Sequence, residues 1–541
     1  MKKNIFWAIL FLIFFIACDE KESKNSNNFS IPSENIVHKV KLEEDLTEFS
    51  NNEKLVIKLL IRASMYNDSM FFYENISNFK EIYSQIKDQE KKELFVYNFG
   101  PWDRFNENKP FIEGFGEKPS GANFYPNDIT VEEFQNYPDN CKNSLYTFIR
   151  RNQEGELYCV PYNVQFKTYI DSISVLLLKA AELTDSPEFS EYLIQRSKDI
   201  KTDNYFKSDS LWVRLQYNKL DYVFGPIQIL DDCLFNLKAE HQSFLLVKDE
   251  VWSEKMHKYN KWLRFLQKAI PVPEEYRAEE PGSNSSISVY DIIFFGGSAT
   301  AGGTLISVVL PLESQTQITQ GVKNLQFKNI MESKFDAVLK PISDIVLTDL
   351  QKEYISSEAF FVNTILYEMA NSLGIRNTIN GNGTVRNALK DYYTTTSHIK
   401  NYALSLFLAE KLYEVSELSN DLKENYLTFV VDLLRRIRFG LNNEYAKSNI
   451  VFYNYLVENK AIKYDKNNHI MIDYNRMKTA TESLTNQVII MQGNGDYSGV
   501  KAFVDEHLYI DEKLYNLIIS INNNNIPTDI EIVQGEDVLK F

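Results

Sequence analysis

The 541-residue chain is 44% hydrophobic and 24% charged, a composition that excludes a disordered chain, a protein with many membrane spans and a small disulfide scaffold. Its formal net charge of −16 provides no basic footprint for the phosphates of nucleic acid. We therefore expect a large globular protein, with about three domains or two large lobes and no nucleic-acid partner.

The first residues predict export and anchoring. Two lysines precede an apolar run from Ile5 to Ala17, which is too short to cross a ~30 Å hydrocarbon core as a helix and is typical of a signal peptide, here residues 1–17. The run ends in the letters FIAC, which resemble the lipobox of bacterial lipoproteins. This resemblance implies that Cys18 is lipidated, that residues 18–50 form a tether, and that a membrane of the bacterial cell envelope holds the protein. An ordinary signal peptide with an incidental cysteine is the alternative.

The remaining cysteines, Cys141, Cys159 and Cys233, show no C-x-x-C spacing. The sequence therefore encodes neither a zinc ribbon nor a disulfide framework. At most one disulfide can form.

The first half of the body mixes helical and extended patterns. Apolar residues recur at three- and four-residue spacing over 53–66 and 172–183, which predicts amphipathic helices. A sheet is expected next, because short β-branched and aromatic runs follow at 222–224, 244–247, 289–295 and 305–310. The glycine-rich segment 296–303 leads from one strand to another, so we interpret it as a turn and not as a phosphate-binding loop.

The second half is mostly helical. Helical periodicity is clear over 357–373, and from Lys340 the pattern continues to about Leu517, apart from an extended piece near 470–473. The 6 histidines of the chain include no H-x-x-x-H pair, the spacing that puts two imidazoles on one face of a helix. No histidine-rich metal site is therefore written locally.

Several motifs resemble the bacterial branch of the dipeptidyl peptidase III family of zinc metallopeptidases. They are NFGPWDR (98–104), PFIEGFGEKPSGANFYP (110–126), SLYTFIRR (144–151), RFG (438–440) and GDYSGVKA (495–502). The resemblance extends from about residue 51 to residue 534.

The resemblance implies a helix-rich α+β fold with two lobes that face each other across a wide cleft. The lower, mixed lobe would hold a β-barrel-like core and comprise residues 51–250 and 289–335. The upper, helical lobe would comprise residues 251–288 and 336–520, and residues 521–541 would be a C-terminal tail.

The same resemblance shows that the metal-binding residues are replaced. Where the family has H-E-x-x-H, this chain has Tyr367, Glu368 and Asn371, so only the general-base glutamate remains. His398 stands where we would place the third zinc ligand, on a second helix, and Tyr445 replaces a histidine that supports the transition state. A phenol and an amide are poor substitutes for the two imidazoles that zinc requires.

The substrate-binding positions are changed as well. Val309 and Leu312 stand where the family has asparagines that hold the N-terminal end of a peptide, and Gln228 stands where an acidic residue is usual. We therefore expect a pseudopeptidase without zinc, which binds a peptide or a protein in the cleft. The alternatives are an active metallo-exopeptidase whose rebuilt zinc site uses Glu368 and His398, and a purely structural partner.

Overall fold

The computed structural model describes residues 37–282, 285–418, 420–440 and 444–541. The predicted signal peptide, Cys18 and residues 18–36 of the predicted tether lie outside these ranges. Within the described part of the chain, no helix is both long enough and apolar enough to cross a membrane.

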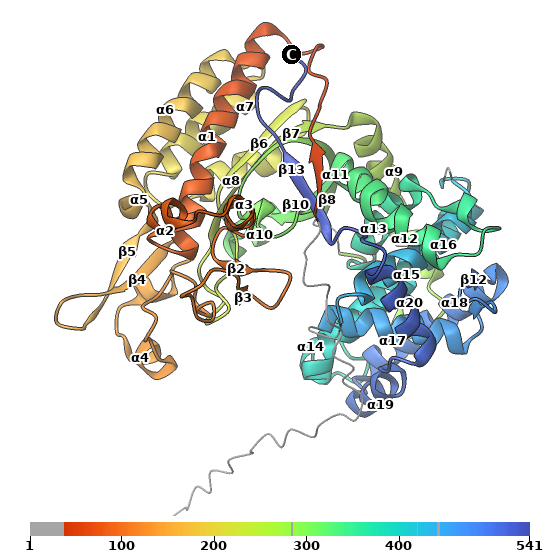
Figure 1. Ribbon diagram of the computed structural model, residues 1–541. Helices are drawn as coiled ribbons and strands as arrows, with labels where there is room; N and C mark the ends of the chain where they lie inside the picture. The colour runs from red at the N-terminus through yellow and green to blue at the C-terminus, as the bar shows by residue number, and fades with distance from the viewer. Residues whose placement is uncertain (1–36, 283–284, 419, 441–443) are drawn as a thin grey trace, which may run out of the picture.

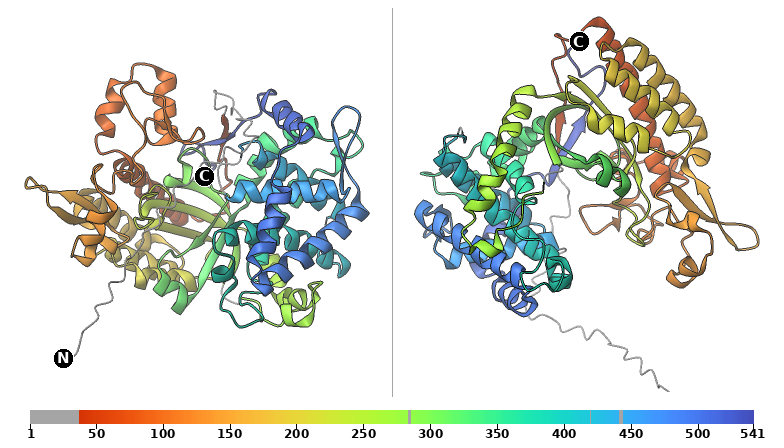
Figure 2. Two further views of the ribbon diagram at one scale, coloured as in Figure 1. Left: turned by 90° about the horizontal axis from the view of Figure 1, so that it is seen from below. Right: turned by 180° about the vertical axis from the view of Figure 1, so that it is seen from behind.

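Two lobes are visible in Figures 1 and 2, and each has its own apolar core. One core collects buried residues between Leu42 and Ile330, together with Ile530 and Leu539 from the end of the chain. The other core is built from Met256–Val289 and Met331–Ile521. We call the first the mixed lobe and the second the helical lobe. The expected helix-rich, two-lobed α+β fold is thereby confirmed.

The mixed lobe is organised around a five-stranded sheet with the order β6-β7-β8-β10-β9. The strands of the whole chain are β1 (Val37–Lys41), β2 (Trp102–Asp103), β3 (Lys109–Pro110), β4 (Thr147–Arg151), β5 (Leu157–Pro161), β6 (Leu220–Gln228), β7 (Glu240–Lys248), β8 (Ser285–Gly297), β9 (Ser307–Leu310), β10 (Val322–Phe327), β11 (Ile462–Tyr464), β12 (Ile470–Ile472) and β13 (Asp529–Val533). Only β8 and β10 run parallel within this sheet. Its outer strands β6 and β9 do not pair with each other, so the expected barrel-like core is wrong and the sheet is open.

Helices cover the sheet and fill the helical lobe. They are α1 (Asn51–Asn75), α2 (Phe79–Gln85), α3 (Gln89–Asn98), α4 (Val131–Asn136), α5 (Tyr162–Gln165), α6 (Lys167–Leu183), α7 (Pro187–Asp199), α8 (Phe206–Arg214), α9 (Glu250–Ala269), α10 (Ser314–Gln320), α11 (Lys328–Lys334), α12 (Lys340–Val346), α13 (Ser357–Ala370), α14 (Val385–Leu389), α15 (Tyr393–Glu414), α16 (Leu422–Ile437), α17 (Glu444–Glu458), α18 (Tyr474–Asn494), α19 (Tyr497–His507) and α20 (Glu512–Asn522). Many begin at a polar N-cap; Ser356, for example, accepts a hydrogen bond from the amide of Ala359 at the start of α13.

The two ends of the described chain pair with each other. Strand β1 runs parallel to β13, with Val37 opposite Asp529 and Lys41 opposite Val533, and Figure 1 shows the pair beside both lobes. The tether expected over residues 18–50 therefore does not extend to residue 50, and the expected tail contains a strand. Apolar spacing alone did not reveal the pairing, because β1 and β13 are each partly exposed and lie nearly 500 residues apart in sequence.

A disulfide joins Cys141 to Cys159, which lie 18 positions apart in the sequence. Closing a loop of this size stabilises a fold by about 3 kcal/mol in the chain-entropy model. We therefore expect Cys141→Ser together with Cys159→Ser to lower the free energy of unfolding by about 3 kcal/mol in urea titrations. Cys233→Ser, at the exposed free cysteine, is the control and should change stability little. Equal stability of the double variant and this control would contradict the expectation.

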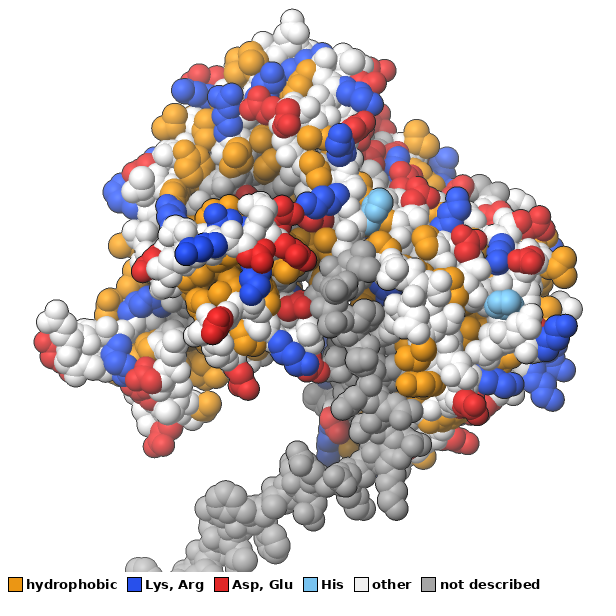
Figure 3. Space-filling model, in the orientation of Figure 1, with side chains coloured by type: hydrophobic (Ala, Val, Ile, Leu, Met, Phe, Trp, Pro, Cys, Tyr) orange, Lys and Arg blue, Asp and Glu red, His pale blue; other side chains and the backbone are white. Residues whose placement is uncertain are grey.

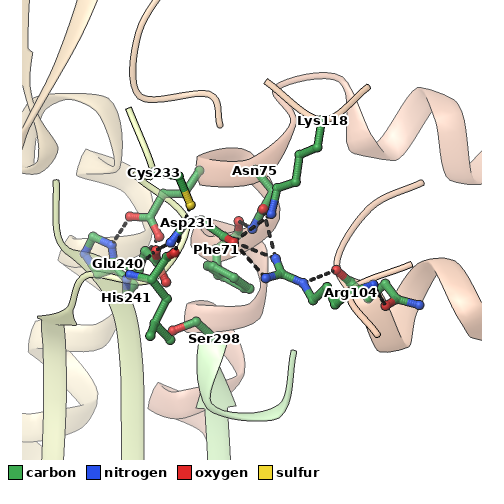
Figure 4. A network of polar contacts seen from close by, with 12 residues as sticks. Phe71, Asn75, Arg104, Lys118, Asp231, Cys233, Glu240, His241 and Ser298 are labelled. Atoms are coloured by element: carbon green, nitrogen blue, oxygen red, sulfur yellow. Dashed lines mark hydrogen bonds and ion pairs between the residues drawn. The ribbon is translucent and has the colours of Figure 1, made fainter. Parts of the chain in front are cut away.

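A buried ion cluster connects the stretches 98–104 and 110–126 (Figure 4). Arg104 donates from both terminal nitrogens to Asp231, at 2.8 and 2.6 Å, and Lys118 donates to the same carboxylate at 2.6 Å. Arg104 also donates to Asn75 at 3.0 Å, at the end of α1. The cluster therefore ties two loops, α1 and the segment after β6 into one unit.

The glycine-rich turn is fitted to this cluster. Gly302 has φ +64°, and a Cβ there would lie 2.6 Å from Cβ of Arg104. A side chain at this position would displace Arg104 from Asp231. The turn predicted over 296–303 is confirmed, and its glycine serves the packing of the mixed lobe.

Candidate functional site

The expected metal-ligand positions converge where α13 packs against α15. Tyr367 and Glu368 lie in the last turn of α13, Asn371 is its C-cap residue, and His398 lies in the first half of α15. Asn401, one turn after His398, donates to the side-chain oxygen of Asn371. The backbone thus brings positions 367, 371 and 398 together, as the sequence predicts.

An aromatic cluster fills this place. It consists of Tyr367, His398, Tyr402 and Tyr445. The Tyr367 hydroxyl and Nδ1 of His398 share a hydrogen bond of 2.5 Å. The rings of Tyr367 and Tyr402 have centroids 5.1 Å apart, and Tyr445 meets the His398 imidazole edge-on at 5.0 Å. Burial raises the pKa of Tyr367 and lowers the pKa of His398, so both side chains are neutral at pH 7.

Arg436 brings a fixed positive charge against the aromatic cluster. Its Nη1 donates to the hydroxyl of Tyr402 at 3.1 Å and to that of Tyr445, and its Nη2 pairs with Asp432. After burial, the charge of Arg436 is the second cause of the lowered pKa of His398. A guanidinium in contact with the aromatic cluster opposes both the protonation of His398 and the binding of a divalent metal ion.

The retained carboxylate of Glu368 reaches the mixed lobe. It accepts hydrogen bonds from the amides of Asn371 at 3.2 Å and Asn324 at 3.3 Å. Burial raises the pKa of Glu368, although both amides lower it. Asn324 lies on β10 directly opposite Val309 on β9, which places Val309 next to the site. Two neutral amides thus hold the carboxylate of Glu368.

The structure does not bring all the expected substrate residues to this place. Val309 is 45% exposed, and Leu312 follows β9 at the edge of the mixed core. Gln228 ends β6, at the opposite edge of the sheet and four strands from β9, which is roughly 19 Å at the usual strand spacing. Gln228 is therefore not beside Val309.

The donor set does not fit zinc. Zinc takes imidazole nitrogen, thiolate or carboxylate ligands, whereas Tyr367 is a phenol with a raised pKa and Asn371 offers a neutral amide. Nδ1 of His398 is occupied by Tyr367. Among the described residues, no group of three or more His, Cys, Asp or Glu side chains could hold a metal ion. We therefore derive no metal-dependent step from this site.

Sequence reasoning missed several residues of the site, among them Arg436, Asn324 and Lys400. Arg436 lies about 70 positions from Tyr367, Asn324 comes from the other lobe, and neither belongs to a local motif. Lys400 caps the end of α13 by donating to the carbonyls of Ala370 at 3.2 Å and Leu373 at 2.8 Å, and burial lowers its pKa to about 8. Lys400, Asn401 and Tyr402 had a signal in the sequence, because they closely follow His398 in the same helix.

The lowered pKa of His398 gives a test of the aromatic cluster. In an NMR titration of the histidines, assigned with His398→Gln, the His398 resonance should change at a pH below the ordinary value of about 6.5. Because the unfolded chain then binds this proton more readily than the folded one, stability should fall as the pH drops through 6.5. The fall should be smaller in His398→Gln. A His398 midpoint above 6.5 would contradict the neutral imidazole.

Comparisons with known proteins find the same overall fold. No family model matches the chain. A solved structure of DPP III from Caldithrix abyssi is 31% identical, with a TM-score of 0.89 over 93% of this chain and 98% of that chain. The dipeptidyl-peptidase III of Corallococcus sp. strain EGB is 25% identical, with a TM-score of 0.76 over 92% of this chain and 95% of its own. A curated protein of Arabidopsis thaliana, Nudix hydrolase 3, is 24% identical over 91% of this chain and 72% of its own length.

Proposed function

The chain belongs to the dipeptidyl peptidase III family, and we propose that it is a pseudopeptidase, which has lost the family's zinc chemistry and binds a peptide or protein between its lobes. The hydrogen bond between Tyr367 and His398 carries this proposal. It places a neutral phenol and a neutral imidazole against each other at two positions where the family would ligate zinc.

The chemistry of the site supports the proposal. A zinc peptidase depends on a metal that lowers the pKa of its bound water to about 7. Glu368 is held by Asn324 and Asn371, and the nearest fixed charge on the aromatic cluster is the guanidinium of Arg436. These groups can donate hydrogen bonds to a ligand, but none of them generates a nucleophile from water at neutral pH.

The substrate side supports binding without turnover. Val309 puts an apolar, exposed side chain beside Asn324, and Leu312 follows it, so two amide contacts to a peptide N-terminus are replaced by apolar ones. We propose that the ligand lies between the lobes and presents an apolar group to Val309.

The alternative with a rebuilt zinc site has no supporting observation. Glu368 and His398 would need a third ligand, and the described residues contain no suitable group of His, Cys, Asp or Glu side chains. Arg436 would in addition oppose the metal ion.

Peptidase activity tests the proposal. Purified protein should release no dipeptides from unblocked peptides, with or without added Zn²⁺, because neither the metal nor its activated water is supplied. The assay needs an active member of the family as a positive control. Release of dipeptides that is abolished by EDTA would overturn the proposal in favour of the rebuilt site.

We also propose that the protein is a lipoprotein of the bacterial cell envelope, anchored through Cys18. The disulfide between Cys141 and Cys159 supports an oxidising compartment, because cytosolic thiols are kept reduced. Mass spectrometry of the mature N-terminus should show a lipid on Cys18 and none in Cys18→Ala. An unmodified Cys18, or cleavage at another residue, would refute the anchor.

A further inference from the structure

A cavity of about 580 Å³ lies in the mixed lobe, where the C-terminal half of α1 meets α2 and the start of α6 (Figure 1). This volume is within the ~300–1,000 Å³ that small-molecule sites usually have. Among the described residues that line the cavity, none has an expected catalytic, metal-binding or substrate-binding role. The cavity is therefore a feature of the mixed lobe that the candidate site at α13 and α15 does not include.

Aromatic rings form part of the cavity wall. Tyr73, Phe79 and Tyr169 contribute them from α1, α2 and α6, and each of these side chains is partly exposed. Other rings pack against two of them. Phe72 stacks on Phe79 with ring centroids 4.9 Å apart, and Phe166 meets Tyr73 edge-on at 5.6 Å. Because packed rings lose little conformational freedom when a ligand binds, the wall offers preformed apolar faces.

Neutral polar side chains complete the wall. They belong to Ser69, Ser77, Asn78, Gln165 and Thr168. Asn78 is the N-cap residue of α2, a position where the side chain usually accepts a hydrogen bond from the helix, but it makes no such bond. Within the described part of the chain, the other four side chains likewise make no hydrogen bond. Since hydroxyls and amides both donate and accept, these groups suit a ligand that does both.

The lining carries no net charge. Within the described residues, its charged side chains are the exposed Lys80 and Glu81, one cation and one anion. Nearby, Lys167 and Asp171 pair with each other at 2.6 Å on the surface of α6. Figure 3 shows acidic and basic side chains intermixed over the face of the mixed lobe on which Figure 1 shows α2. An ionic ligand therefore gains little here over a neutral one.

We propose that this cavity binds a neutral saccharide. The C–H groups on the faces of a sugar ring pack against aromatic rings, and sugar hydroxyls both donate and accept hydrogen bonds. A proline-rich peptide also packs on aromatic rings, but proline has no N–H, so such a peptide offers mainly acceptors. The side-chain carbonyls of Asn78 and Gln165 would then lack a donor. The inference goes beyond the proposed function and does not depend on the loss of peptidase chemistry.

Saturation-transfer difference NMR of the purified full-length protein tests the site with four neutral disaccharides: maltose, cellobiose, lactose and N,N′-diacetylchitobiose. At least one of them should bind saturably at millimolar concentration or below, with saturation transferred most strongly to the C–H protons of one sugar ring. Tyr169→Ala and Gln165→Leu should each weaken this binding at least tenfold. Tyr169→Phe keeps the ring and should bind nearly as tightly as the wild-type protein.

Matched controls lie outside the cavity. Tyr217→Ala is the control for the ring, because Tyr217 is 95% exposed and does not line the cavity. Gln153→Leu is the control for the amide, because Gln153 is exposed between β4 and β5. Both controls should bind as the wild-type protein does. The melting temperature of each variant reports whether it folds, and if Tyr169→Ala does not fold, Gln165→Leu decides.

Two results would overturn the assignment at once. One is the absence of saturable binding by any of the four disaccharides, and the other is equal binding by the wild-type protein and folded Gln165→Leu. Decaproline that displaces the bound disaccharide and binds more tightly would identify a peptide groove, and would overturn the assignment as well. Failure of decaproline to displace the disaccharide would support the saccharide site.

Discussion

Asp231→Ala is expected to lower the free energy of unfolding by about 3–5 kcal/mol, because it leaves Arg104 and Lys118 as unpaired charges inside the mixed lobe. Although burial raises the pKa of Asp231, the charges of Arg104 and Lys118 outweigh burial and hold this pKa below its ordinary value. The carboxylate is therefore ionised in the folded protein at pH 7. Urea titrations followed by tryptophan fluorescence measure the loss, since Trp212 is buried in the mixed lobe.

The control for this loss is Asp171→Ala. Asp171 pairs with Lys167 at 2.6 Å, but both side chains are more than half exposed, and such pairs contribute at most about 1 kcal/mol. If Asp231→Ala and Asp171→Ala lower stability equally, the buried ion cluster does not hold the mixed lobe together.

Restoring the family's ligands should create a zinc site. In the triple variant Tyr367→His, Asn371→His and His398→Glu, two imidazoles stand one turn apart on α13 and face a carboxylate on α15. Zinc should rise from a trace to about one ion per chain, because the backbone already brings the three positions together. The carboxylate introduced at position 398 would also lie near Arg436 and weaken its repulsion of the metal.

Peptidase activity should return only weakly in this variant. Tyr445, Val309 and Leu312 would still deprive the transition state and the peptide N-terminus of their usual contacts. Asn371→His alone, which leaves Tyr367 against His398, is the control and should not retain zinc. If the triple variant folds but binds no zinc, the two helices do not present these positions as the family does.

Most of the architecture could be predicted, because most helices and strands leave a local pattern of apolar residues in the sequence. The helix expected over 357–373 is α13, and the four expected strand segments are β6, β7, β8 and β9. The predicted barrel-like core was wrong. Whether β6 and β9 pair and close the sheet depends on how the sheet curves, and local sequence spacing does not report this curvature. The pairing of β1 with β13 was missed because the two strands are partly exposed and lie nearly 500 residues apart in sequence.

The candidate site, too, could be predicted only in part. The positions of Tyr367, Asn371, His398 and Tyr445 could be aligned with motifs, and the structure places them together. What occupies the place of the metal could not be predicted, because Arg436 and Asn324 arrive from elements remote in sequence. The proposal that the site holds no zinc rests on these contacts as much as on the absence of the two expected histidines.

The zinc content of the wild-type protein tests the central claim most directly. Protein purified from zinc-supplemented cells without a chelator is measured by inductively coupled plasma mass spectrometry, beside the triple variant as a positive control. We predict far less than one zinc per chain in the wild-type protein, and the same melting temperature with and without EDTA. Near-stoichiometric zinc that is lost in His398→Gln would contradict the account and show a rebuilt metal site.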